Sequence, residues 1–500
     1  MTDRRFGVAA HARARPDATA LVADDRRITY GELDAGVNRA AHAFRKRGVV
    51  PGDRVAVALR NRPEFFEAAL AAARLGADVI PLSWRFKRDE VRAIVDDANA
   101  RLVIAEADAH ETMHDLPALH LGGPYEDALA AEPGTAPDGA LDPAPVFYRY
   151  YTSGTTGVPK AVERPKPSLD AYLAGVLGYP TMQGVTSEGD VHLVCGPLYH
   201  TAPCAFGNYA LLLGQTIVLM THFDAEHALR LFERDRVTWT HMVPINFVRI
   251  LALPDDTRAR YDLSSTKRIL HAAAPCPVDV KRRIMDVFPD DTVLEYYGMT
   301  EGLATIIPPD EWLKKPGSVG RAGPGLEVSI RDDEGNELAA GEVGLVYVSP
   351  MGGVRFEYGN APDKTAQAWL GDRYTVGDMG YLDEDGYLFL TDRKVDMIIS
   401  GGANIYPAEV EAVLYRHPAV GDCAVIGVPD DEWGEAVLAV VEPRAPVTGD
   451  DLIAFCRANL AHYKCPRLVE LVDKLPRDES GKVRKRELRD PHWADRERKI

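Results

Sequence analysis

Hydrophobic residues follow two spacings along the first part of the chain. Thr29 and Glu32 have the spacing of a capping box, and apolar residues then recur every three or four positions, which predicts a helix. Residues 54–59 (RVAVAL) form an almost unbroken apolar run, which is typical of a buried strand. Pro63 and Gly76 bracket a second helical pattern, and further strand-like runs follow. Strands that alternate with helices predict parallel sheets covered by helices, an α/β fold.

The same alternation continues through the middle of the chain, with one interruption. Residues 122–145 are rich in Gly, Pro, Ala and Asp, and we predict a surface connection there. Strand-like segments occur at 191–196 and 239–244. Asp224 is placed to cap a helix that runs to about Arg236. These segments extend the α/β pattern beyond the interruption.

The last part of the chain predicts a change of architecture. Strand–turn–strand alternation after a Gly/Pro-rich loop predicts a β-rich subdomain. Residues 392–396 are the expected hinge, because a helix, two strands and a second helix follow them, which is the pattern of a small α+β domain. We therefore predict a large N-terminal domain (1–391) of parallel-type sheets with helices plus the β-rich subdomain, and a C-terminal α+β domain (397–500).

Composition narrows the class of protein. The chain has 500 residues, of which 46% are hydrophobic and 27% charged, as expected for a globular protein with more than one domain. Its net charge of −17 argues against nucleic acid as a partner, because phosphate binding depends on Lys and Arg. The six cysteines include no CxxC pair, which argues against disulfides and zinc and favours a reducing cytoplasm. No apolar run has the length of a transmembrane segment.

Residues 151–160 (YTSGTTGVPK) carry the first candidate chemistry. Ser153, Thr155 and Thr156 supply hydroxyl donors, and successive backbone N–H groups can form an anion-binding nest. The glycines let the backbone approach a ligand closely, and Lys160 adds a positive charge suited to phosphate. The Walker pattern GxxxxGK[ST] is absent. Composition alone favours an ordinary polar surface loop.

Three later segments contain residues that suit a nucleotide. Residues 292–301 (TVLEYYGMTE) predict a strand that ends in a Tyr–Gly turn, with a ring that can stack on a base and a carboxylate that can hold Mg²⁺. Asp378 lies in a Gly-flanked turn, where it can accept hydrogen bonds from ribose hydroxyls or form an ordinary Asx turn. Arg393 can bind phosphate or ribose as a fixed cationic fork. Residues 475–482 (LPRDESGK) place Lys482 on an exposed loop, where a solvated basic tail is the ordinary alternative.

The order of these segments resembles that of the adenylate-forming (AMP-binding) superfamily, and it is most similar to that of acyl-CoA synthetases. The resemblance covers nearly the whole chain, from the phosphate loop to the terminal lysine. It implies an acid–thiol ligase that uses ATP and Mg²⁺ to convert a carboxylic acid into an acyl-adenylate and then transfers the acyl group to CoA. Such enzymes rotate the small domain between the two half-reactions, so the resemblance also implies a mobile C-terminal domain. A homodimer is expected at the level of the family.

The resemblance assigns expected roles to residues of this sequence. The expected catalytic residues are Lys482 at the carboxylate and α-phosphate, Thr300 at the α-phosphate, and His200 beside the carboxylate. The expected Mg²⁺ ligand is Glu301. The expected nucleotide-binding residues are Thr152, Ser153, Gly154, Thr155, Thr156, Gly157, Lys160, Ala273, Ala274, Pro275, Tyr297, Gly298, Asp378 and Arg393. The expected acyl-pocket residues are Trp239 and His241, and the expected CoA-loop residues are Gly401 and Gly402.

Structural roles stay open for several of these residues. Trp239 and His241 suit core packing as well as an acyl pocket. The small residues at 272–275 suit close helix–strand packing as well as contact with adenine. His200 on its own is typical of an ordinary loop histidine.

Departures from the family pattern leave the acceptor and the hinge open. Ala161 replaces a glycine common in the family, and Val395 stands where relatives often carry Asp or Lys, so the hinge residue is Val395 or Asp396. A carrier-protein phosphopantetheine, an amine or nitrite could replace CoA as the acceptor. A third interpretation is a nucleotide-binding regulatory protein without catalysis, against which the retention of Lys482 and Thr300 argues.

Overall fold

The computed structural model describes residues 6–109, 116–152, 160–478 and 481–494 of the chain. The chain forms two compact units. Unit 1 comprises residues 1–242, 252–270 and 354–366, and unit 2 comprises residues 243–251, 271–353 and 367–500. Both units therefore take residues from segments that are distant in sequence.

Unit 1 is built mainly on parallel strand pairs, with β2 antiparallel to β1. The first sheet has the order β4 (Asp78–Pro81), β3 (Arg54–Ala58), β5 (Leu102–Ala105) and β6 (Ala118–His120), with every neighbouring pair parallel. The second contains, in order, β12 (Arg268–His271), β11 (Trp239–Met242), β9 (Val191–Val194), β10 (Thr216–Leu219), β1 (Thr19–Ala23) and β2 (Arg26–Thr29). A small antiparallel sheet joins β18 (Glu357–Tyr358), β8 (Lys160–Glu163) and β7 (Tyr151–Thr152).

The helices of unit 1 connect these strands, as expected for parallel pairing. They are α1 (Val8–Ala14), α2 (Tyr30–Lys46), α3 (Pro63–Arg74), α4 (Arg88–Ala98), α6 (Pro124–Ala130), α7 (Leu169–Met182), α8 (Thr201–Leu212), α9 (Ala225–Arg234) and α11 (Asp255–Arg258), and α14 (Pro362–Ala368) begins in the same unit. Among the residues that the structure describes, no helix is both long and apolar enough to cross a membrane.

Unit 2 contains mainly antiparallel sheets. A hairpin of β13 (Val293–Met299) and β14 (Gly302–Ile307) is extended by β15 (Arg321–Ala322). A second sheet has the order β19 (Trp369–Leu370), β20 (Arg373–Tyr374), β17 (Gly344–Val348), β21 (Asp378–Leu382) and β22 (Leu388–Arg393), with β16 (Val328–Arg331) paired to β17. A third has the order β24 (Ala403–Ile405), β23 (Ile398–Ser400), β26 (Gly434–Pro443) and β25 (Val420–Asp430), with β27 (Leu468–Leu471) paired to β26.

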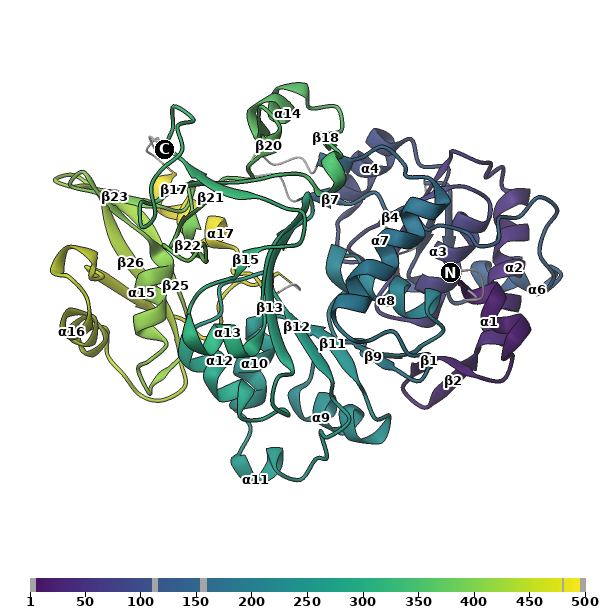
Figure 1. Ribbon diagram of the computed structural model, residues 1–500, viewed down its shortest axis with the longest axis horizontal. Helices are drawn as coiled ribbons and strands as arrows, with labels where there is room; N and C mark the ends of the chain where they lie inside the picture. The colour runs from purple at the N-terminus through teal and green to yellow at the C-terminus, as the bar shows by residue number, and fades with distance from the viewer. Residues whose placement is uncertain (1–5, 110–115, 153–159, 479–480, 495–500) are drawn as a thin grey trace. The chain divides into compact units, whose positions relative to one another are not determined.

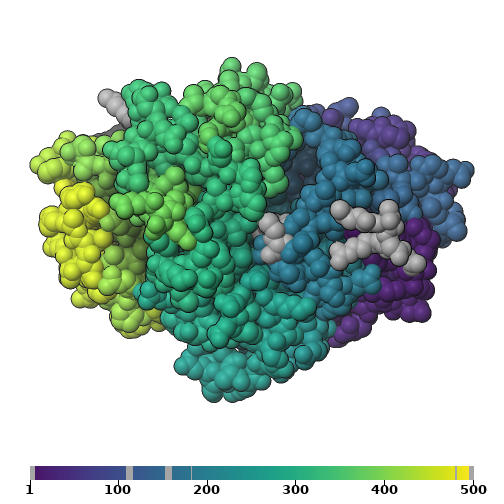
Figure 2. Space-filling model, in the orientation of Figure 1, coloured from purple at the N-terminus to yellow at the C-terminus, as the bar shows by residue number. Residues whose placement is uncertain are grey.

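The helices of unit 2 cover these sheets. They are α10 (Pro244–Leu251), α12 (Val278–Met285), α13 (Pro309–Lys314), α15 (Pro407–Leu414), α16 (Gly449–Asn459) and α17 (Lys485–Arg489). Figure 1 shows α15 beside β25 and β26, and Figure 2 shows the yellow C-terminal residues gathered against the yellow-green residues that precede them.

Both faces of the long β25–β26 hairpin are buried. Cys423 and Val425 contribute to a core with α15 and α16, whereas Ala424 and Ile426, which point to the other face, contribute to a second core that includes Leu475. Because both faces are covered, these strands have continuous apolar runs in the sequence rather than an alternating pattern.

Several predicted elements are confirmed. The Thr29 hydroxyl accepts from the Glu32 N–H at 3.1 Å, and the Glu32 carboxylate accepts from the Thr29 N–H at 2.8 Å, which completes the capping box of α2. Asp224 caps α9 by accepting from the His227 N–H at 2.7 Å. The predicted strand at 54–59 is β3, which pairs in parallel with both of its neighbours.

The prediction of a surface connection over residues 122–145 is wrong for part of that segment. It contains α6, in which Pro124 occupies the first helical turn. The Glu126 carboxylate accepts from the Gly123 N–H at 2.7 Å, and Tyr125 is buried with 1% of its surface exposed. The sequence contained this signal, a proline at the helix start followed by an acidic residue, but the surrounding Gly, Pro and Ala obscured it.

Two predicted turns are also displaced. β13 continues through Tyr297 and Gly298 to Met299, with an irregularity in register between Tyr297 and Gly298, so the turn lies three residues later, at Thr300 and Glu301. Asp378 opens β21 instead of lying within the turn. In both cases pairing with a neighbouring strand extends the element beyond what local turn residues predict.

Replacing Phe44 with alanine tests the core of unit 1. Phe44 in α2 is fully buried, with 0% of its surface exposed, and its removal leaves a cavity. We expect Phe44→Ala to lower the free energy of unfolding by about 3–5 kcal/mol, measured by urea denaturation followed by circular dichroism. The control is Val50→Ala, because Val50 is 51% exposed. This variant should change the free energy of unfolding by less than about 0.5 kcal/mol. Equal losses in the two variants would contradict this placement of the core.

Candidate active site

Three predicted nucleotide-binding residues meet between two hairpins of unit 2. The Tyr297 hydroxyl, on β13, donates to Asp378 Oδ2 at 2.6 Å. Asp378 on β21 is the cross-strand partner of Arg393 on β22, and Arg393 Nε lies 3.2 Å from Asp378 Oδ1. The side chain of Asp378 is 14% exposed and that of Arg393 51%, so the cluster keeps an open side.

Electrostatics fix the charge states of this cluster. Burial raises the pKa of Tyr297 well above its usual value, and the Asp378 carboxylate raises it further, so the phenol stays protonated. Burial alone would lower the pKa of Arg393, but the carboxylates of Asp378 and Asp396 outweigh this and raise it. The cluster therefore presents a neutral ring, a carboxylate that already holds one hydrogen bond, and a permanent cation.

Thr300 and Glu301 form the two-residue connection between β13 and β14, where Met299 pairs with Gly302. The turn is enclosed by neighbouring groups, because Glu301 is 9% exposed and a side chain at Gly302 would meet the Tyr374 hydroxyl. A tight hairpin with little freedom holds the Thr300 hydroxyl and the Glu301 carboxylate close together.

The described ends of the loop that carries Lys482 are held by hydrogen bonds and by one close contact. The Lys482 N–H donates to Asp478 Oδ1 at 2.9 Å, and the Asp478 N–H donates to the Lys482 carbonyl at 2.8 Å. Gly481 has φ +83, and a Cβ there would overlap Ile245 in α10, so only glycine fits. Gly481 therefore lies directly against α10.

Lys482 interacts electrostatically with charged residues of the Tyr297–Asp378–Arg393 cluster. The Lys482 residue is exposed, yet the protein atoms around its ammonium displace enough water to lower its pKa, and the guanidinium of Arg393 lowers it further. The carboxylates of Asp378 and Glu301 act in the opposite direction. Residues from the β13–β14 turn, β21, β22 and the C-terminal loop are thus brought together within unit 2.

The predicted adenine turn has a strained backbone. Ala273 has φ +77, in the left-handed region that side chains other than glycine rarely adopt. Ala273 and Pro275 are exposed and Ala274 is partly exposed, so a flat ring can reach this turn. The turn joins β12 to α12.

The predicted phosphate loop lies mostly outside the described residues. This applies to Ser153, Gly154, Thr155, Thr156 and Gly157. The loop starts and ends in a strand pair, because Thr152 in β7 is the antiparallel partner of Lys160 in β8. Its two ends are therefore adjacent, as a compact loop requires.

The predicted acid-side residues form an aromatic cluster in unit 1. His200 lies at the start of α8, with its ring centre 4.5 Å from that of Tyr199. Trp239 and His241 are buried on β11, and the Phe206 ring on α8 lies 6.0 Å from the Trp239 ring and 5.6 Å from the His241 ring. Burial lowers the pKa of His241 to about 3, and the charge of His200 acts in the same direction. His241 is therefore neutral at physiological pH.

Gly401 and Gly402 form the turn between β23 and β24, with φ +59 and +82. A side chain at Gly401 would overlap the ring of Trp433, whose carbonyl accepts from the Gly401 N–H at 2.8 Å. The predicted loop is therefore a tight hairpin with an indole packed over it. The sequence analysis missed Trp433, and the two glycines were the only hint of a bulky neighbour.

The predicted hinge segment is bound to α17. Arg489 Nη1 donates to the Val395 carbonyl and to Asp396 Oδ1, both at 3.2 Å. Val395 is 44% exposed. The choice between Val395 and Asp396 as the hinge stays a prediction.

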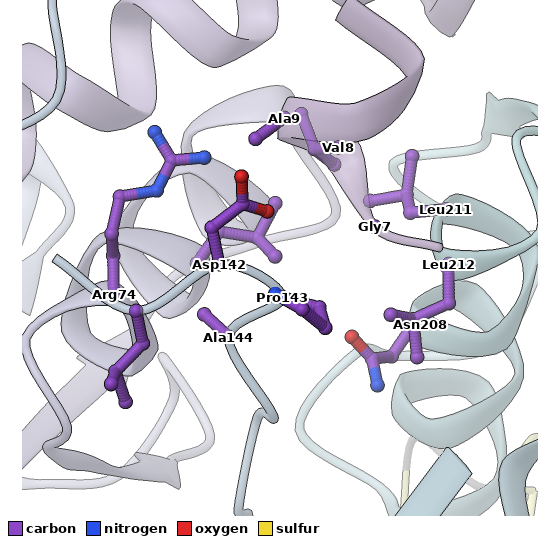
Figure 3. A pocket seen from close by; sticks show the side chains of 12 residues that line it. Gly7, Val8, Ala9, Arg74, Asp142, Pro143, Ala144, Asn208, Leu211 and Leu212 are labelled. Atoms are coloured by element: carbon purple, nitrogen blue, oxygen red, sulfur yellow. The ribbon is translucent and has the colours of Figure 1, made fainter. Parts of the chain in front are cut away.

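A pocket in unit 1 lies apart from the predicted residues. Its lining comes from the start of α1, from α3 and α8, and from the segment before Val146, and it includes none of the predicted site residues. Figure 3 shows the Arg74 and Asp142 side chains on one side of it and Asn208 on the other. Arg74 is already paired with Asp34, so this pocket offers no obvious uncompensated charge.

Comparisons with known proteins decide the family. The model described as "AMP-binding enzyme" matches residues 8–354, and that described as "AMP-binding enzyme C-terminal domain" matches residues 409–482. The chain belongs to the AMP-binding enzyme family. It is 37% identical to a feruloyl-CoA synthase from an Amycolatopsis species over 96% of each chain. It is 32% identical to the fatty acid–[acyl-carrier-protein] ligase ScoC of Streptomyces coeruleorubidus, over 98% of this chain and 96% of that one.

The fold is shared with solved AMP-binding enzymes. The o-succinylbenzoate CoA synthetase MenE of Bacillus subtilis, solved with ATP and a magnesium ion, matches with a TM-score of 0.81 and 28% identity, over 95% of this chain and 97% of that one. The predicted superfamily, α/β fold class and AMP-forming acyl-CoA synthetase activity, with ATP, Mg²⁺ and CoA, are confirmed by these matches. The roles of individual residues stay predictions.

Glu301 fits the expected Mg²⁺ site. The described part of the chain contains no group of three or more His, Cys, Asp or Glu side chains able to hold a metal ion. Mg²⁺ is commonly bound by one or two carboxylates together with substrate phosphates, and Glu301 supplies one such carboxylate close to two cations that would bind the same phosphates.

Asp378→Asn tests the assignment of the ribose site. Loss of the negative charge weakens the hydrogen bonds that ribose hydroxyls donate, and it removes the partner of Arg393. We expect AMP affinity, measured by calorimetry, to fall by roughly 10- to 100-fold, since a hydrogen bond to a charged group contributes about 1.5–3 kcal/mol. Asp383→Asn, at an aspartate of the same β21–β22 hairpin that pairs with Lys315 at 2.8 Å, should leave AMP affinity unchanged. An equal effect in both variants would contradict the assignment.

Proposed function

We propose that this AMP-binding enzyme activates a hydrophobic or aromatic carboxylic acid, with Lys482, Thr300 and His200 as its catalytic residues. The observation that carries the proposal is the cluster in which the Tyr297 hydroxyl donates to Asp378 at 2.6 Å and Arg393 Nε lies 3.2 Å from the same carboxylate. The charge of Lys482 interacts with Arg393 and Asp378, although it lies far from both in sequence.

In the first half-reaction a carboxylate oxygen of the acid attacks the α-phosphorus of ATP. The bond from that phosphorus to the oxygen shared with the β-phosphate breaks, which yields acyl-adenylate and pyrophosphate. Charge develops on the phosphoryl oxygens, so the protein acts mainly by positioning and by stabilising charge. Lys482 binds the carboxylate and the α-phosphate, and Thr300 donates to the α-phosphate. Glu301 would hold Mg²⁺, which would supply positive charge against the phosphates of ATP.

The nucleoside is bound by groups of unit 2. Tyr297 stacks on one face of adenine, and the turn at 273–275 borders its edge. Asp378 accepts hydrogen bonds from the ribose, and Arg393 interacts with ribose or phosphate. Gly298, next to Tyr297, keeps the strand free of a side chain where the nucleotide approaches. The loop that starts at Thr152 and ends at Lys160 binds the pyrophosphate.

In the second half-reaction a thiolate attacks the acyl carbon, and AMP leaves as the anhydride bond breaks. We assign the Gly401–Gly402 hairpin to the acceptor. Rotation of a C-terminal domain (397–500) about a hinge at 392–396 would exchange Lys482 for this hairpin between the steps. The two family models match on either side of this hinge, which supports the proposed boundary.

We infer the chemical class of the carboxylic acid from the aromatic cluster around Phe206. Phe206 and His241 offer rings, and a neutral His241 can exchange a hydrogen bond with a polar substituent, whereas the Trp239 ring is stacked on His192 and bonded to Gln215. The similarity to a feruloyl-CoA synthase supports an aromatic acid. We also propose a cytoplasmic protein, for which six free cysteines are suited, and a homodimer.

A carrier protein is the second candidate acceptor. The similarity to ScoC, named as a fatty acid–[acyl-carrier-protein] ligase, favours it specifically. In that case the thiol of a phosphopantetheine replaces that of CoA, and the first half-reaction is unchanged.

A substrate panel tests the proposal. Pyrophosphate release is measured with aromatic, medium-chain and long-chain acids, each with and without CoA. We expect multiple turnovers that need CoA, and a fall of roughly 10²–10³ in Lys482→Ala because one preorganised donor is lost. Lys474→Ala, at an exposed lysine upstream of the loop, is the matched control and should keep full activity. Equal activity of Lys482→Ala and wild type would overturn the role of Lys482, and release that CoA does not stimulate would favour the carrier protein.

The pH dependence gives an independent prediction. Lys482 must carry its proton to stabilise negative charge, and burial together with Arg393 lowers its pKa below that of a free lysine. The rate of adenylate formation should be constant below this lowered pKa and fall as the pH rises through it. Lys482→Arg keeps its charge throughout, so this fall should disappear in that variant. The same alkaline fall in both proteins would assign it to another group and contradict the prediction.

A further inference from the structure

A buried ion pair lies beside the strained turn between β12 and α12. The Lys281 ammonium, on α12, donates to Glu295 Oε2, on β13, at 2.5 Å. The Lys281 side chain is 0% exposed and that of Glu295 8%. Burial lowers the pKa of Lys281 and raises that of Glu295, and the attraction between the two groups opposes both changes. The ammonium also lies 4.5 Å from the centre of the Trp312 ring, on α13, which fixes its position from a second side.

The same carboxylate contacts both ends of the turn. Glu295 Oε2 lies 3.6 Å from Nε2 of His271, the last residue of β12, and 2.5 Å from Nζ of Lys281, in the first turn of α12. The His271 ring packs edge-on against Phe247 of α10, with ring centres 5.2 Å apart. Figure 1 shows α10, α12 and α13 grouped beside β13. Residues 272–277, the turn itself, are therefore flanked by a lysine that is hydrogen-bonded to Glu295 and by a histidine that lies near the same carboxylate.

The turn needs such support. Ala273 has φ +77, and a non-glycine residue keeps this conformation only when its surroundings enforce it. Ala273 and Pro275 are exposed, so their own side chains are not packed firmly enough to do so. The contacts through Glu295, at the two ends of the turn, are the ones placed to hold it.

Glu295 also fixes the strand that carries Tyr297. It lies two residues before Tyr297 in β13, and the Tyr297 hydroxyl donates to Asp378. We infer that Lys281 and Glu295 are positioning residues, which hold the turn at 272–277 and the ring of Tyr297 at the spacing that a purine between them requires. This inference rests on the proposed nucleotide site.

The experiment removes both partners at once. Removing one partner leaves a buried charge and destabilises the fold, whereas an apolar pair of similar volume is often neutral for stability. We therefore choose Lys281→Met with Glu295→Leu, and compare AMP affinity by calorimetry with the melting temperature. We expect AMP affinity to fall about tenfold or more, since a displacement of about 1 Å costs up to about 10²-fold. The melting temperature should stay near that of wild type, and KM for CoA should not change.

A second ion pair of unit 2 provides the matched control. Lys464 Nζ lies 2.7 Å from both carboxylate oxygens of Glu409 and far from the turn in sequence. Lys464→Met with Glu409→Leu makes the same chemical change and should leave AMP affinity unchanged. Wild-type AMP affinity in the Lys281/Glu295 variant, or the same loss in this control, would overturn the inference.

A change in the turn itself makes the test specific. Glycine adopts a φ near +77 without strain, so Ala273→Gly should make the turn less dependent on the ion pair. In that background the Lys281/Glu295 substitutions should weaken AMP binding by about threefold or less, a coupling expected only of residues that act on one feature. An undiminished loss would overturn the inference. If Asp378→Asn also binds AMP normally, the proposed nucleotide site has failed, and that outcome is distinguishable from failure of the ion pair alone.

Discussion

The structure depends on a balance between two cations that repel each other. Arg393 lowers the pKa of Lys482, so the protein holds like charges within reach of one another. The carboxylates of Asp478, Asp378 and Glu301 oppose this effect by raising the pKa of Lys482, and Asp378 also accepts from the Tyr297 hydroxyl. Lys482 and Arg393 nevertheless give the site two cations that can pair with the phosphates of ATP and with a carboxylate. These two local cations explain how a chain with a net charge of −17 can bind two anionic substrates.

Each group in this balance is held by backbone structure rather than by packing alone. Asp378 and Arg393 are cross-strand partners, so their separation is set by the ladder of β21 and β22. Thr300 and Glu301 are confined to a two-residue hairpin. Lys482 follows a glycine that only fits because it has no side chain. Rigid supports of this kind allow charged groups to be placed without reorganisation when the substrate binds.

Local signals in the sequence predicted local structure well. The capping box of α2, the helix-starting proline of α3 and the alternation of strands and helices all act over a few residues, and the structure confirms them. The ordered motifs also indicated Tyr297, Asp378, Arg393 and Lys482, which the structure brings together. These motifs succeed because each local backbone shape needs particular residue types.

Features set by long-range contacts could not be predicted in this way. The strand through Tyr297 and Gly298 is decided by pairing with β14, not by the glycine. The contact of Lys281 with Glu295 and Trp312, and that of Trp433 with Gly401, join residues that no short pattern connects. The sequence indicated nothing about Phe206 except that it lies in an apolar run, so its place in the aromatic cluster could not be predicted. Such contacts depend on how whole helices and strands pack together, and no short stretch of the sequence determines that packing.

The most direct test of the account separates the two half-reactions of Lys482→Ala. Single-turnover formation of acyl-adenylate from acid and ATP is measured first, and transfer of a preformed acyl-adenylate to CoA is measured in the same protein. The account predicts that the first rate falls by roughly 10²–10³ while the second stays within about twofold of wild type. An equal fall in both rates, or an unchanged first rate, would contradict the central claim that Lys482 stabilises charge during adenylation.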